Sequence, residues 1–282
     1  MGNATDRTRT TPFLTGLARA FGGAIFFSLP LLMTMEMWWL GFHMDRLRLA
    51  LLMLAMVPLL IALDHYVGFK KEQTTWREDV PDGMIAYGVG IVSSCAVLLL
   101  FNVLNLDMPL QEWVGKVALQ AVPASFGAVL ATSQLGGEET DDEQRVSEKA
   151  PEGGYWAELL FMLTGAVFLA FNVAPTEEIA LIAFQINAWY ALAIAIVSLA
   201  LMHAIVYAVE FSGSPGMPED TPEWSVFLRF TVTGYAIALL VSAYVLWTFG
   251  RFDGDPLIMN TMQTVVLAFP AALGAAGARL IL

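Results

Sequence analysis

Cysteine and charge are both scarce in this sequence. One cysteine, Cys95, occurs among 282 residues, which excludes an intrachain disulfide and a zinc site built from several cysteines. Only 14% of the residues are charged, whereas soluble domains carry about 25%. So few charged side chains cannot cover the surface of a soluble protein of this length. The composition therefore excludes an ordinary soluble enzyme and a disordered chain.

Basic residues are scarcer than acidic ones. Lysine and arginine total 14, and aspartate and glutamate total 26, so the net charge at pH 7 is -12. This balance argues against nucleic acid as a partner, because phosphates are bound by basic patches. It argues equally against docking on anionic lipid headgroups.

The familiar catalytic motifs are also missing. The sequence has no Walker phosphate loop, no Gly-x-Gly-x-x-Gly after a strand, no His-Glu-x-x-His and no Gly-x-Ser-x-Gly. We therefore expect a protein that is not an enzyme. No cofactor is certain, and a bound divalent cation is the candidate that the polar residues below suggest.

Apolar residues are abundant, at 57% of the chain, and the mean hydropathy is +0.63. A bilayer core needs about 20 mostly apolar residues per helix, and eight such runs occur. They are apolar on all sides, whereas barrel strands alternate. The prediction is an all-α polytopic membrane protein in contact with the lipid bilayer, with runs at 20–42, 47–69, 83–104, 113–131, 156–174, 188–211, 226–249 and 257–282.

The basic residues orient these helices, because cytoplasmic loops carry an excess of lysine and arginine. With the N-terminus in the cytoplasm, ten basic residues lie inside, and four lie outside: Arg46, Arg48, Lys116 and Arg251. We expect a multi-pass protein of the bacterial inner membrane with both termini cytoplasmic. The sequence leaves the oligomeric state open, a homo-oligomer included.

The two halves of the chain match each other in four places, which indicates an internal duplication. An even number of helices per repeat makes the second repeat enter the membrane in the same direction as the first. This predicts two parallel four-helix repeats about a pseudo-two-fold axis along the membrane normal, at 1–135 and 155–282, joined by an acidic cytoplasmic linker at 136–154. The matches are Gly23-Ala24-Ile25-Phe26 with Gly165-Ala166-Val167-Phe168, Ala62-Leu63-Asp64-His65 with Ala200-Leu201-Met202-His203, Tyr87 with Tyr235, and Pro123-Ala124-x-x-Gly127 with Pro270-Ala271-x-x-Gly274.

Two glutamates share a place in this register. Glu36 aligns with Glu178, and a threonine precedes each by two residues, Thr34 and Thr176. Two carboxylates close to a shared axis hold a cation between them or share one proton. Hard cations such as calcium prefer oxygen ligands. The predicted function is cation transport, of a divalent metal ion or a proton, with Glu36, Glu178, Glu177, Thr34, Thr176 and Asn172 as ion-binding candidates and Glu36 and Glu178 as metal ligands.

A structural interpretation of the same residues stays open. Counted from Ala20, Glu36 lies in the outer third of its run. The segment Ala174-Pro175-Thr176-Glu177-Glu178 is also typical of a helix start, because proline and acidic residues favour the first turn.

Two histidines and two prolines form further matched pairs. His65 and His203, with Asp64 beside the first, are candidates for proton transfer or for a pH switch, or simply hydrogen-bonded residues near a helix end. The pair would also suit the axial ligands of a haem, which gives a redox membrane protein as an alternative function. Pro123 and Pro270 are candidate gating hinges or packing residues.

The acidic linker supports one more alternative. Glu138, Glu139, Asp141, Asp142 and Glu143 cluster in its first part. Such a charge block is usually a solvated segment. It could also be the surface through which a non-transporting membrane scaffold or sensor binds its partner.

The stretch from Phe27 to Trp39, together with Ala174-Pro175-Thr176-Glu177-Glu178, resembles a family of bacterial multi-pass integral membrane proteins that has no assigned activity. The resemblance spans the chain and implies a membrane protein without naming a site. A looser likeness to cation/calcium exchangers rests on the Pro-Glu of their broken helices. Exchanger repeats are inverted, whereas these are predicted to be parallel, so no exchanger ligand is transferred to this chain.

Overall fold

The computed structural model describes residues 7–67, 76–134, 154–208 and 223–281, and every regular element among them is helical. Eight helical stretches in these ranges are long and apolar enough to cross a membrane. The predicted all-α class with eight membrane spans is therefore confirmed. The chain divides into two compact units, Met1–Glu139 and Thr140–Leu282, each of which is described by itself.

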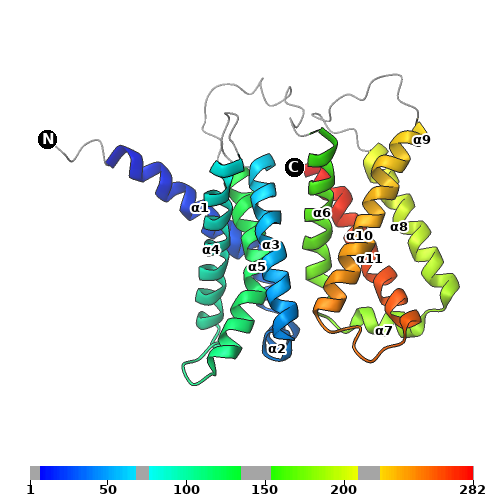
Figure 1. The fold of residues 1–282 in the computed structure, drawn as a ribbon, viewed down its shortest axis with the longest axis horizontal. Helices are drawn as coiled ribbons and strands as arrows, with labels where there is room; N and C mark the ends of the chain where they lie inside the picture. Colours follow the sequence, from blue (N-terminus) through cyan, green and yellow to red (C-terminus); the bar gives the residue numbers. More distant parts are fainter. Residues whose placement is uncertain (1–6, 68–75, 135–153, 209–222, 282) are drawn as a thin grey trace. The chain divides into compact units, whose positions relative to one another are not determined.

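The first unit contains four spans and one short helix. The order is α1 (Arg7–Leu32), α2 (Met35–His43), α3 (Arg46–Val67), α4 (Trp76–Leu100) and α5 (Leu110–Gln134) (Figure 1). The short helix is α2, which lies between the first and second spans at one end of the unit.

The second unit has the same order of elements. Its first span is α6 (Gly154–Val173), followed by the short helix α7 (Glu178–Gln185) and by α8 (Ala188–Ala208). The third span runs from α9 (Glu223–Val226) through a π-helical turn, η1 (Phe227–Val232), into α10 (Thr233–Thr248), and α11 (Leu257–Ile281) is the fourth. That the units are parallel repeats stays a prediction, because it concerns their relation to each other.

The first predicted run, residues 20–42, is wrong as a single span. The helix α1 ends at Leu32, and Thr34 has an extended backbone with φ -93° and ψ 117° before α2 begins. Side chains satisfy the polar groups at this break: the Thr34 hydroxyl donates to the Pro30 carbonyl at 2.6 Å, and the Trp38 indole donates to the Leu32 carbonyl at 2.8 Å. Hydropathy does not register the break, because the residues on both sides are apolar.

The fourth span is the central helix of each unit. The helix α5 packs against α1, α2, α3 and α4, and α11 packs against α6, α7, α8 and α10. The other helices of a unit are thus held in place by contacts with the same helix.

Glycines bring the first and fourth spans of each unit into backbone contact. A Cβ atom added to Gly23 of α1 would collide with the carbonyl oxygen of Gly127 on α5. In the second unit, a Cβ atom added to Gly165 of α6 would collide with the carbonyl oxygen of Gly274 on α11. Small residues permit such close approach in membranes, where packing drives helix association. The glycines are those that the duplication aligns.

The third span also ends in the same way in both units. Asn102 after α4 and Gly250 after α10 have positive φ angles, of 55° and 74°. A residue in the left-handed backbone conformation commonly caps the C-terminus of a helix. The N–H group of the residue after it then donates a hydrogen bond to a carbonyl oxygen in the last turn of the helix. The bond is Val103 N–H to Leu98 O in the first unit and Arg251 N–H to Leu246 O in the second, each 2.9 Å long. In the register that aligns Tyr87 with Tyr235, the two caps coincide, which supports the duplication.

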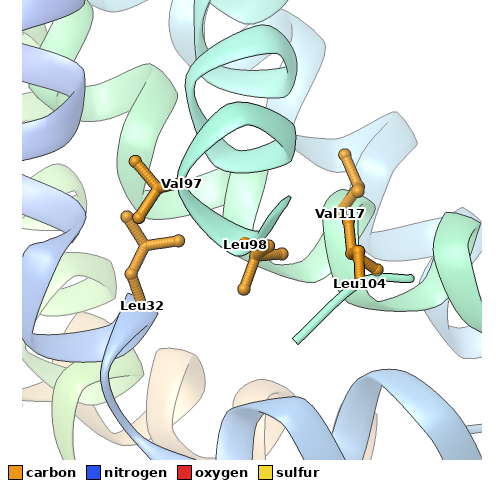
Figure 2. Close-up of a cluster of buried hydrophobic side chains, with 5 residues drawn as sticks. All are labelled: Leu32, Val97, Leu98, Leu104 and Val117. Atoms are coloured by element: carbon orange, nitrogen blue, oxygen red, sulfur yellow. The ribbon is translucent and has the colours of Figure 1, made fainter. Parts of the chain in front are cut away.

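An apolar cluster fixes the place where α1 ends. Leu32, the last residue of α1, lies beside Val97 and Leu98 of α4, and Leu104 and Val117 complete the cluster (Figure 2). Trp38 of α2 packs against the same residues. The cluster therefore holds the end of the first span and the start of the short helix together.

We expect Gly23→Ala and Gly274→Ala to destabilise the protein. Overpacking a close contact costs about 1–3 kcal/mol, so the thermal unfolding midpoint in detergent should fall. Gly22→Ala and Gly277→Ala are matched controls, since a Cβ atom at either position meets nothing within 4 Å. Alanine favours helix formation by about 1 kcal/mol over glycine, so the controls should be unchanged or more stable. Equal melting of all four variants would contradict the proposed crossing.

Candidate functional site

Each unit places a glutamate in the first turn of its short helix. Glu36 is the second residue of α2, and Glu178 is the first residue of α7. Figure 1 shows both helices at the end of their own unit, next to the spans that they connect. Acidic side chains are favoured there, because the unpaired N–H groups of a first turn carry partial positive charge. The helix start predicted at Pro175-Thr176-Glu177-Glu178 is confirmed by α7.

The short helix α2 is held against the fourth span. A Cβ atom on Gly41 would lie 2.6 Å from Lys116 Cα, so the backbones of α2 and α5 nearly touch. Lys116 is buried and forms an ion pair with Glu112 at 2.5 Å. Glu36, five residues before Gly41 on the same helix, is half-buried.

The short helix α7 is held by an arginine. The guanidinium of Arg251, in the loop between α10 and α11, donates a hydrogen bond to the carbonyl oxygen of Pro175. Ile179 and Ala183 of α7 are buried, in line with the packing of this helix on α11. Glu177 and Glu178 remain exposed at its start.

The environment of Glu178 lowers the pKa of its carboxyl. The main cause is a hydrogen bond from the Thr176 side chain, followed by the backbone N–H of Glu178; desolvation opposes them, and the charge of Arg251 adds to the lowering. The Thr176 hydroxyl also lies 2.9 Å from the Val173 carbonyl oxygen. A hydroxyl has one proton, so it donates to only one of these acceptors at a time. Both arrangements leave Glu178 ionised at neutral pH.

The structure brings together only part of the predicted ion site. Thr176, Glu177 and Glu178 adjoin one another at the start of α7, and Thr34 directly precedes α2, which carries Glu36. Asn172 lies one turn earlier, on α6, and its amide donates to the Phe168 carbonyl of the same helix at 2.8 Å. Glu36 and Glu178 belong to different units, so their pairing stays a prediction.

A metal site has little support within the described ranges. No group of three or more histidine, cysteine, aspartate or glutamate side chains that could hold a metal ion occurs there. Arg251 adds a positive charge near Glu178. A divalent cation at this end of the second unit would need oxygen ligands beyond these carboxylates.

The matched histidines have different partners. His65 on α3 lies 2.6 Å from a carboxylate oxygen of Asp79 on α4, measured from its Nδ1 atom. His203 on α8 lies 3.1 Å from the hydroxyl of Thr231, again from Nδ1. Asp64 is half-buried, one residue before His65. Both histidines thus join the second span of their unit to the third.

The remaining predictions concern hinges and the linker. Pro123 and Pro270 lie inside α5 and α11, and each helix continues past its proline. Their role as hinges stays a prediction. The acidic linker at 136–154 lies outside the described residues, apart from Gly154.

Sequence reasoning missed three polar residues of these ends: Asp79, Arg251 and Glu158. Asp79 was hidden in a mixed segment before the third run, and its role depends on α3 packing against α4. From the sequence, Arg251 is only one of the four basic residues expected outside the membrane, and nothing there predicts its bond to Pro175. Glu158 of α6 pairs with Arg279 of α11 at 2.9 Å, and the Arg279 guanidinium lies 4.0 Å from the centre of the Phe230 ring. Arginine at a helix end was a usable signal for a partner, since buried charges are paired.

Residues 16–282 match the model of a protein family described as "Putative integral membrane protein (DUF2391)". The match covers nearly the whole chain and all eight spans apart from the first residues of α1. No curated protein and no solved structure is significantly similar to the chain.

We expect Thr176→Val to raise the pKa of Glu178 towards the ordinary glutamate value, about 4.3, because the main hydrogen bond to the carboxylate is lost. A lowered pKa contributes stability above the ordinary pKa, and this contribution disappears as the pH falls through the folded value. The variant should therefore lose the part of the folding stability that the lowered pKa of Glu178 contributes at neutral pH. Carbon-13 NMR of the side-chain carboxyls measures the titration, with Glu178→Gln to assign the resonance.

Thr261→Val is the control for this experiment. The Thr261 hydroxyl donates to the Leu257 carbonyl of its own helix, so the titration of Glu178 should not change. An unchanged titration in Thr176→Val as well would show that the threonine does not hold the carboxylate.

Proposed function

We propose that this chain, which belongs to the family of integral membrane proteins described above, transports cations across the membrane, with Glu36 and Glu178 as the carboxylates that receive them. The observation that carries the proposal is the shared position of these residues. In each unit, one glutamate occupies the first turn of the short helix that follows the first span. Ionisable residues within membrane spans mark ion and proton pathways, and Glu36 and Glu178, next to the ends of the spans, would receive ions at the entrance of such a pathway.

A second titratable group at the opposite end of each unit supports transport. The span α3 starts next to α2 and has 22 residues, so it rises about 33 Å at 1.5 Å per residue. His65, near its far end, is therefore about a membrane thickness away from Glu36. The sequence order places His203 and Glu178 in the same way in the second unit. Each unit thus has a carboxylate at one end and a histidine at the other.

The proton is the better candidate of the two predicted ions. A divalent metal ion needs several oxygen ligands, and the described part of the chain holds no group of three or more carboxylate, histidine or cysteine side chains for it. The positive charge of Arg251 near Glu178 also opposes a divalent ion. A proton needs one titratable group and a hydrogen-bonding neighbour, which His65 has in Asp79 and His203 has in Thr231.

The proposal also includes the location of the protein and its orientation in the membrane. The chain is an integral membrane protein with multiple spans. The bacterial inner membrane is the proposed location, and the excess of basic residues on one side supports an orientation with both termini in the cytoplasm. A transporter or channel, rather than an enzyme, agrees with the missing catalytic motifs.

We expect purified protein in liposomes to move protons down an imposed gradient, recorded with an entrapped pH-sensitive dye. Glu36→Gln and Glu178→Gln should each reduce the rate by about tenfold, the effect of about 1.4 kcal/mol. Asp107→Asn is the matched control, because Asp107 is an exposed carboxylate in the loop between α4 and α5 and should not affect the rate. A calcium-sensitive dye in parallel vesicles tests the divalent alternative.

The other outcomes point to the other functions. A protein without any flux, which retains a partner only while the acidic linker is intact, would be the scaffold or sensor. A haem absorption spectrum that disappears in His65→Ala and His203→Ala would identify the redox protein. Either result would overturn transport as the function.

A further inference from the structure

Buried serines in the spans usually bond to their own helix. The hydroxyls of Ser28, Ser93, Ser125 and Ser198 each donate to the carbonyl oxygen four residues earlier. This is the common arrangement for serine in a transmembrane helix, because the bond removes the cost of a bare hydroxyl in an apolar medium.

Ser94 on α4 and Ser242 on α10 depart from this pattern. Both side chains are completely buried, with 0% exposure. Neither hydroxyl has a hydrogen-bond partner among the residues that the structure describes. A buried hydroxyl without a partner costs about 1–3 kcal/mol, and buried water commonly supplies the partner in native proteins.

The two serines occupy the same place in their units. In the register that aligns Tyr87 with Tyr235, Ser94 aligns with Ser242. Each lies six residues before the end of its span, at Leu100 and Thr248, which puts it about 9 Å inside at 1.5 Å per residue. The unsatisfied hydroxyl therefore occurs in both units, inside the apolar span.

The serine in the first unit lies on the face that packs against the fourth span. One turn earlier, a Cβ atom on Gly90 would lie 2.8 Å from the Ala121 carbonyl oxygen and would also collide with the Ser125 hydroxyl on α5. Residues four apart share a helix face, so Ser94 lies on this face too. Leu98, a further turn on, is also completely buried.

Further buried polar groups occur in both units. Towards the histidine end of the second unit, Tyr235 and Thr231 lie seven and eleven residues before Ser242, which keeps them on one helix face. Gln263 lies six residues into α11, as far from the carboxylate end as Ser242; it is buried, and its amide donates to Asp255 while its oxygen has no partner in the described part of the chain. Gln120 of the first unit is likewise buried, donates to the Leu31 carbonyl and has an oxygen without such a partner.

We propose that Ser94 and Ser242 each bind water inside their unit, and that this water carries protons between the carboxylate end and the histidine end. A hydroxyl accepts a proton from water on one side and releases its own proton to water on the other. One O–H bond therefore forms as another breaks, and the serine is unchanged. This inference rests on the proposed function, and it specifies both the ion and the path within each unit.

The competing interpretation is a rotated side chain. A turn about χ1 would direct either hydroxyl to the backbone carbonyl four residues earlier, that of Gly90 or Ala238, as in the other buried serines. Such a serine would hold no water and carry no proton. The two interpretations predict different effects of alanine substitution at Ser94 and Ser242: only the water-binding interpretation predicts a loss of proton transport.

We expect the double variant Ser94→Ala and Ser242→Ala to lose proton transport by about tenfold or more, equivalent to about 1.4 kcal/mol per tenfold change, while each single variant loses less. The matched control is the double variant Ser93→Ala and Thr264→Val, which removes two hydroxyls that bond to their own helices. It should transport at the wild-type rate. Circular dichroism and size-exclusion chromatography establish that all variants are folded.

A spectroscopic measurement tests the water directly. Infrared difference spectra of the wild-type protein in ordinary and oxygen-18 water should show bands of internal water, and these bands should weaken in the serine-to-alanine variants but not in the control. Proton flux that is absent from the wild-type protein would overturn the proposed function. Wild-type flux with unaffected serine variants, or wild-type spectra without internal water bands, would overturn this inference alone.

Discussion

A backbone contact between two glycines is the constraint on which each unit of this protein depends. Lipid tails are as apolar as leucine, so helices in a membrane associate through close packing rather than through the hydrophobic effect. Gly23 with Gly127, and Gly165 with Gly274, let the first and fourth spans touch where any side chain would collide. Because the fourth span also contacts the other helices of its unit, this crossing holds the first span among them, and in the first unit the apolar cluster around Leu32 then fixes its end. The end of the first span in turn positions the short helix and its glutamate.

The break after the first span changes the chemistry of that glutamate. In the middle of a continuous span, an ionised carboxylate would cost roughly 2.5–3.5 kcal/mol. At the start of a short helix it meets unpaired N–H groups, which favour its charge. The polar groups of the break are satisfied locally, by Trp38 in the first unit and by Arg251 in the second. The lowered pKa of Glu178 follows from this setting, so its carboxylate stays ionised and would attract protons to the membrane end without storing one.

The sequence predicts whatever depends on composition and on local chemistry. Eight apolar runs were sufficient for the spans, and Pro175-Thr176-Glu177-Glu178 was sufficient for the start of α7. The break at Thr34 was not predictable, because Met33 and Met35 continue the apolar run and no proline stands between them. The partnership of His65 with Asp79 was not predictable either, since it depends on which helices pack together. Ser94 and Ser242 resemble any serine in an apolar run, and only the packed structure separates them from serines that bond to their own helix.

The two units differ at some buried polar positions and agree at others. The position of buried Lys116 on the fourth span is Gln263 in the second unit, and each contacts the same aligned position, Met108 or Asp255. The partner of the histidine is a carboxylate in one unit and a hydroxyl in the other. The buried residues that agree, such as Ser94 with Ser242, are neutral. A fixed charge in the apolar interior would need a partner there, whereas a hydroxyl can pass a proton without holding a charge. Under the proposed function, the shared neutral serines would serve the same step in both units, and the partners that differ would adjust each unit separately.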